Sequence, residues 1–147
     1  MSPTEELHSG DGDALQRYLA ARGLPVTAQR RGLRGLVTAW KTVARDAARY
    51  DLTLDDWRND LDLRDIIAGA VEVASVDDQK ETRDRLAKAD ALFLQSTVDT
   101  GRSLGGGLEV SGGRGHRASH WWYYRRPGQP GDTIRAELVA ARLLTEG

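Results

Sequence analysis

The chain has 147 residues, of which 39% are hydrophobic and 29% are charged, a composition typical of one soluble globular domain. Its 21 lysines and arginines nearly balance its 22 aspartates and glutamates, so the chain as a whole is not a polyelectrolyte. Cysteine is absent, which excludes disulfide scaffolds, thiol catalysis, iron–sulfur clusters and zinc sites built with cysteine.

The first residues are polar and acidic, without the basic start and apolar stretch of a secretory signal. No apolar run approaches the ~20 residues that are needed to cross a bilayer. We therefore expect a cytoplasmic protein with no membrane partner. Residues 1–10 are expected to form a disordered tail, and residues 11–147 a single domain.

Two helices are predicted before residue 51. The first covers residues 11–22 and is followed by Gly23, a residue type that often ends helices. The second covers residues 27–50, with Thr27 as its N-cap. Its apolar residues fill one side of the helix: Leu33, Leu36, Val37, Trp40, Val43, Ala44 and Ala47.

The opposite side of this second helix is basic, since six cations fall on it: Arg30, Arg31, Arg34, Lys41, Arg45 and Arg49. Residues 27–50 carry one acid and a net charge of +5, whereas residues 51–78 carry nine acids and two arginines, a net charge of −7. Consecutive helices are usually neighbours, so the simplest expectation is that these charges pair with each other. The alternative is that the basic face binds an acidic partner or phosphate.

Residues 53–74 show two apolar faces that a straight helix does not bury against one core. Leu54, Trp57 and Leu61 share one face, and the apolar residues of 63–73 share nearly the opposite face. We therefore predict a break at Leu61–Asp62, with Asp62 capping a new helix. Another helix is expected from the cap at Ser75–Asp78 to about residue 97.

The character of the chain changes after residue 100, where glycines dominate up to residue 115. We expect a loop there, holding at most a short strand at residues 108–110. Residues 121–124, Trp-Trp-Tyr-Tyr, favour a strand because aromatic residues are enriched in strands. A turn at residues 127–131 then precedes a last helix, capped by Asp132 or Thr133.

These segments predict a mainly α fold. A bundle of about four to five helices occupies residues 11–99. A Gly-rich appendage over residues 100–147, with one or two short strands and a terminal helix, packs on that bundle.

The aromatic segment and the arginines after it are the first predicted binding surface. Alternate side chains of a strand point to opposite faces, so one aromatic pair is expected to dock on the bundle and the other to remain exposed. We expect partner contacts from Trp121, Tyr123, Arg125 and Arg126. A second patch is expected on the basic helix face at Arg34, Lys41 and Arg45.

Nucleic-acid binding is an alternative use of these residues, since arginine fits phosphate and exposed aromatic rings stack on unpaired bases. Against it, the isoelectric point is about 6.3 and no helix-turn-helix, RNA-recognition or zinc-finger signature is present.

A small metal-assisted enzyme is a further alternative. His116 and His120 are four residues apart, but the glycines before them make a poor helix and no glutamate lies beside either histidine. Nucleophile-elbow, phosphate-loop, dinucleotide and calcium-loop motifs are all absent from the sequence. We therefore expect no cofactor and no catalytic residues. The sequence predicts a non-enzymatic interaction protein with a protein partner, and it leaves the oligomeric state open.

Overall fold

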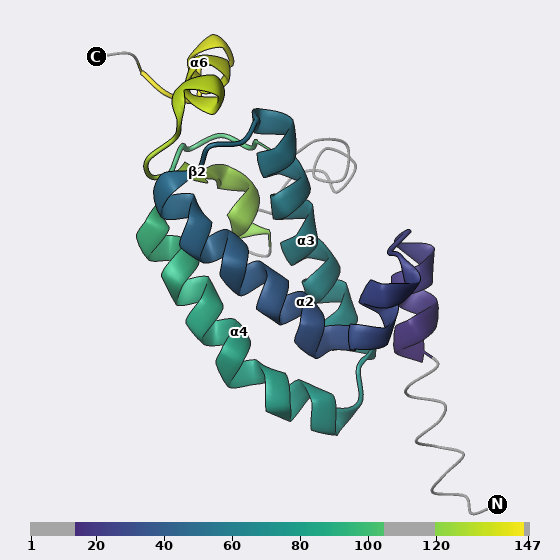
Figure 1. Cartoon of the computed structure of the whole chain (residues 1–147). Helices are drawn as coiled ribbons and strands as arrows, with labels where there is room; N and C mark the ends of the chain where they lie inside the picture. The colour runs from purple at the N-terminus through teal and green to yellow at the C-terminus, as the bar shows by residue number, and fades with distance from the viewer. Residues whose placement is uncertain (1–13, 105–119, 146–147) are drawn as a thin grey trace, which may run out of the picture.

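A computed structural model describes residues 14–104 and 120–145 of the chain (Figure 1). After a first helix at residues 14–21, the long helices are α2 (Val26–Asp46), α3 (Leu54–Val73) and α4 (Val76–Ser96). The shorter elements are the 3-10 helices η1 (Ala47–Arg49) and η2 (Trp121–Tyr124), the strands β1 (Thr97–Asp99) and β2 (Arg125–Pro127), and helix α6 (Asp132–Ala140). The predicted fold class, mainly helical with a small sheet and a terminal helix, is confirmed. The tail at 1–10 and the possible strand at 108–110 lie outside the described residues.

Helix α2 forms the centre of the bundle and lies alongside α4 (Figure 1). All seven apolar residues predicted for the inner side of residues 27–50 are buried, and the six cations predicted on the opposite side are exposed; Ala47 and Arg49 of these lie in η1. The N-cap is Pro25 rather than Thr27, so the predicted cap is wrong and Thr27 lies in the first turn. A kink follows at Gly32, whose φ of 63° lies in the region that favours glycine.

Helix α3 runs without a break, so the predicted interruption at Leu61–Asp62 is wrong. A capping box between Thr53 and Asp56 starts it, as the sequence leads one to expect of Thr53. The helix buries different faces along its length because different elements cover it. Trp57 packs on Phe93 of α4, whereas the Ile66 carbonyl accepts a hydrogen bond from the Tyr18 hydroxyl of the first helix.

Helix α4 starts where the sequence predicts, since the Ser75 side chain accepts a hydrogen bond from the Asp78 amide. It buries Thr82, Ala89 and Phe93. Phe93 lies between two tryptophan rings, with centroids 4.6 Å from Trp40 and 5.8 Å from Trp57. This aromatic group joins α2, α3 and α4 into one core.

The aromatic segment 121–124 is a 3-10 helix, so the predicted strand at these residues is wrong. The strand begins one residue later, at Arg125, and pairs antiparallel with β1 so that Val98 lies opposite Arg126. In a 3-10 helix successive side chains are about 120° apart, so two neighbours can both face the core. Trp122 and Tyr123 do so, whereas a strand would have buried alternate residues.

Helix α6 is the last helix of the described chain and packs through Ile134 and Leu138, which are both buried. Its N-cap is Gly131, which makes no side-chain bond, and Asp132 lies in the first turn. The predicted cap at Asp132 or Thr133 is therefore wrong. Gly131 fits because its backbone amide donates to the Tyr50 carbonyl at 2.6 Å, where an added Cβ would lie 3.0 Å from that oxygen.

Candidate functional site

The aromatic segment, the first predicted surface, is largely part of the core. Tyr123 is 0% exposed and Trp122 is 1% exposed, while Trp121 is half-buried against Phe93. The Tyr123 hydroxyl donates to Asp62 Oδ1 of α3 at 2.6 Å. Burial, and then the Asp62 carboxylate, raise the pKa of this hydroxyl well above its usual value. Tyr123 therefore holds η2 on α3 and offers no contact to a partner.

Arg125 and Arg126, expected as contacts, are both half-buried in β2. The Arg125 Nε donates to Thr97 Oγ1 at 2.6 Å, and one of its terminal nitrogens donates to the Thr97 carbonyl at 3.0 Å. The Arg126 guanidinium donates to the Pro127 carbonyl at 2.9 Å. Burial lowers the pKa of both guanidinium groups. Arg125 thus ties the two strands together, and Arg126 is only partly available to a partner.

A buried ion pair that was not predicted from the sequence lies beside this segment. Arg64 of α3 binds Asp90 of α4 through two hydrogen bonds of 2.9 and 3.0 Å, and the Trp40 indole donates to the same carboxylate at 2.9 Å. The Arg64 guanidinium carbon also lies 4.7 Å from the centroid of Trp122. One signal pointed to it, because Arg64 follows Leu61 by three residues and so continues the buried stripe of α3.

His120 does not form a metal site in the described part of the chain. Its Nε2 lies 3.3 Å from Asp65 Oδ1, and Asp65 also binds Arg22 at 3.0 Å. No group of three or more metal-binding side chains occurs among the described residues. His116, the other histidine considered in the metal-assisted alternative, lies outside them.

The basic face of α2 is exposed, as predicted, but its charges are not paired as expected. Among the described residues, its one ion pair is Arg34 with Glu81 of α4, at 3.4 Å. Both side chains are more than half exposed, so this pair contributes little to stability. The acids of residues 51–78 make ion pairs elsewhere, for example Asp65 with Arg22 and Asp55 with Arg58. The expected compensation between residues 27–50 and 51–78 is therefore not what the fold provides.

Three cations from two helices instead surround one surface cavity of about 360 Å³. Lys41 of α2 and Arg85 and Lys88 of α4 line it, and Val37 and Thr38 complete its wall. None of the three cations makes an ion pair with a residue that the structure describes. Sequence reasoning selected Lys41 but missed Arg85 and Lys88, because residues 79–100 carry as many acids as cations. The three-residue spacing of Arg85 and Lys88, which places both on one helix face, was the available signal.

Arg34 and Arg45 extend this basic surface along α2 on either side of the cavity. Arg45 follows Lys41 by four residues and so lies on the same face, and Arg34 lines a shallower hollow of the helix surface with Arg31. We call Arg34, Lys41, Arg45, Arg85 and Lys88 the basic surface. It holds five cations on a rigid pair of packed helices.

None of the helices in the described part of the chain has an apolar stretch that would carry it through a bilayer. The accessible chemistry is that of the basic surface. The chain matches no protein-family model, no curated protein and no solved structure.

Proposed function

We propose that this chain is a non-enzymatic interaction protein whose basic surface binds an acidic segment of a protein partner. The observation that carries the proposal is the convergence of Lys41, Arg85 and Lys88 on one cavity without an acidic partner among the described residues. Like charges held close together destabilise a fold slightly, so their grouping calls for a reason outside the fold. An acidic partner supplies that reason.

An acidic peptide fits the surface better than a nucleic acid does. The alkyl stems of Lys41 and Lys88, which line the cavity, offer apolar contact to a partner side chain. Glu81 lies at the edge of the surface beside Arg34, and Asp84 is exposed on the same helix. A continuous phosphate backbone would meet these carboxylates, whereas a peptide places its charges singly.

A selection from a random 12-residue peptide library tests the proposal without assuming a partner. The wild-type chain serves as bait, and the double variant Lys41→Glu/Lys88→Glu serves for counter-selection. We expect enrichment of sequences rich in Asp and Glu, and at least tenfold weaker binding of the enriched peptides to the double variant by fluorescence anisotropy. The affinity should fall as salt rises, because the exposed charges are screened.

The matched control is Arg17→Glu/Lys80→Glu, which makes the same change in net charge at exposed residues that do not line the cavity. This control should bind the enriched peptides within about twofold of the wild type. Equal losses in both double variants would show a general charge effect and would contradict the proposal. Tighter binding of a single-stranded oligonucleotide than of any enriched peptide would replace the protein partner with a nucleic acid.

A further inference from the structure

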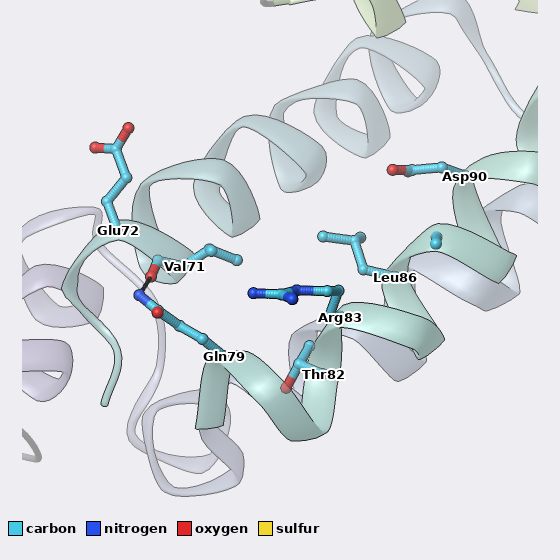
Figure 2. A pocket seen from close by; sticks show the side chains of 8 residues that line it. Val71, Glu72, Gln79, Thr82, Arg83, Leu86 and Asp90 are labelled. Atoms are coloured by element: carbon cyan, nitrogen blue, oxygen red, sulfur yellow. Dashed lines mark hydrogen bonds between the residues drawn. The ribbon is translucent and has the colours of Figure 1, made fainter. Parts of the chain in front are cut away.

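A second cavity of about 420 Å³ lies on the other side of α4, facing the end of α3 (Figure 2). Its walls are mostly apolar, formed by Val71 of α3 with Leu86 and Ala87 of α4. One end is closed by Gln79, whose side-chain amide donates to the Val71 carbonyl at 2.6 Å. Its size falls in the range of small-molecule sites, well above the ~150 Å³ that holds a benzene ring.

One cation points into this cavity without an internal partner. Figure 2 shows the Arg83 side chain extending from α4 into the space toward Val71, while Glu72 points away from it. Arg83 makes no ion pair or hydrogen bond with any residue that the structure describes. A guanidinium beside apolar walls favours a ligand that has one carboxylate and an apolar body.

Thr82 adds a second polar group at the same level of α4. Its side chain lines the cavity although the residue is only 4% exposed, and its hydroxyl makes no hydrogen bond with another residue of the described chain. A hydroxyl that lines the cavity and makes no bond within the described chain is available to a ligand atom that accepts its proton. A carboxylate accepts from both the Thr82 hydroxyl and the Arg83 guanidinium.

The acids around the cavity restrict the ligand further. Asp90 lines the far end, where Arg64 and Trp40 already bind its carboxylate. A second anionic group at the far end of the ligand would approach the Asp90 carboxylate and be repelled. The apolar walls offer few backbone groups, so an alkyl or aromatic body suits them better than a peptide, whose amides would lose their hydration.

We infer that the α3–α4 cavity binds a small amphipathic monocarboxylate, with its carboxylate on Arg83 and Thr82 and its apolar body against Val71, Leu86 and Ala87. Arg83 and Arg85 are two residues apart on α4, hence about 200° apart around the helix. The monocarboxylate site and the basic surface are therefore separate, and this inference does not rest on the proposed function.

Isothermal titration of the full-length chain with sodium decanoate, below its micelle concentration, tests the inference. We expect saturable binding with one site per chain, at least tenfold tighter than the binding of decanol or decanedioate. Arg83→Gln should weaken decanoate binding at least tenfold and remove the preference over decanol. Lys80→Gln is the matched control on the same helix and should leave decanoate binding unchanged, because Lys80 is exposed and lines neither cavity.

Ala87→Phe provides a second variant, because Ala87 is exposed at the cavity and a ring there would occupy the space. It should abolish the binding of decanoate and of decanol alike. Absence of saturable decanoate binding would overturn the inference. Decanoate binding that survives both Arg83→Gln and Ala87→Phe, or tighter binding of a peptide ending in leucine with a free carboxylate, would also overturn it.

Discussion

The aromatic segment of η2, with the arginines after it, and the basic surface of α2 and α4 were both candidates for binding a partner. Each contains arginine, which is common at binding surfaces. In the fold they differ in where their polar atoms are used. Tyr123 donates its side-chain hydrogen bond to Asp62, and Arg125 donates to Thr97, both inside the molecule. The side chains of Lys41 and Lys88 make no hydrogen bond or ion pair with residues that the structure describes.

Because of this difference, we expect one region to stabilise the fold and the other to bind a partner. A polar group that is buried with its partner holds elements together, and removing it leaves the partner without a hydrogen bond. A polar group that is exposed without a partner contributes little to folding and remains available for binding. The two regions should therefore respond in opposite ways to substitution.

The largest effect is expected from removing the buried rings of η2. Trp122→Ala or Tyr123→Ala should lower the free energy of unfolding by about 3–5 kcal/mol, because each leaves a cavity beside α3. Urea denaturation followed by circular dichroism measures this loss. A change below about 1 kcal/mol in both variants would mean that η2 is not part of the core.

Trp121→Ala is the internal control for this prediction, since Trp121 is only half-buried. Its loss of stability should be clearly smaller than that of Trp122→Ala. Tyr123→Phe should lose only the hydrogen bond to Asp62, about 1.5–3 kcal/mol for a bond to a charged group. The difference between Tyr123→Ala and Tyr123→Phe then gives the contribution of the ring alone.

The buried ion pair between Arg64 and Asp90 should give the next largest effect. The two side chains are only 10% and 20% exposed, and Asp90 also accepts from Trp40. Arg64→Met or Asp90→Asn should each destabilise the chain by about 3 kcal/mol, because each leaves a buried charge unpaired. In a double-mutant cycle, Arg64→Met/Asp90→Asn should lose less than the sum of the two single variants, and additive losses would contradict the pairing.

The sequence predicts most of this fold but not the roles of its polar residues. The helical spacing of apolar residues predicts α2. The capping residue Ser75 predicts the start of α4. The continuity of α3 could not be predicted, because it depends on the first helix and α4 covering different faces of it. The buried state of Arg64 depends on Asp90, 26 residues later, and no local pattern shows that contact.

The same limit applies to the predicted binding residues. Tyr123 was expected on the surface because strand alternation would have exposed one aromatic pair, and the 3-10 turn removes that alternation. The exposure of Lys41 could be predicted, because the helical spacing of the apolar residues of α2 shows which side of the helix faces solvent. Arg85 and Lys88 join Lys41 only through the packing of α2 on α4, which the sequence does not specify.

The half-buried carboxyl of Asp60 should make stability depend on pH. Burial raises the pKa of Asp60 above its ordinary value, and the hydrogen bond from Tyr50 opposes this only in part. The folded chain therefore holds the Asp60 proton more tightly than the unfolded chain does. This site lowers stability as pH rises from the ordinary aspartate pKa through the raised one, and the full penalty remains at neutral pH.

Asp60→Asn should remove that penalty and keep an oxygen that accepts from Tyr50. The free energy of unfolding of the variant, measured in urea from pH 3 to pH 7, should increase relative to that of the wild type as pH rises. A difference between the two chains that stays constant over this range would show that Asp60 titrates alike in the folded and unfolded states.

The smallest effect on stability is expected at the basic surface. Lys41→Gln should change the free energy of unfolding by less than about 0.5 kcal/mol, because the side chain is exposed and forms no ion pair with a described residue. The sign should be slightly stabilising at low salt, since the substitution relieves repulsion from Arg85 and Lys88. Added salt screens that repulsion, so the gain should vanish near 1 M NaCl, where the Debye length is about 3 Å. Thermal unfolding at low and high salt measures it. A loss of stability at both salt concentrations would show that Lys41 has a structural partner, and the contrast between η2 and the basic surface would then fail at its central residue.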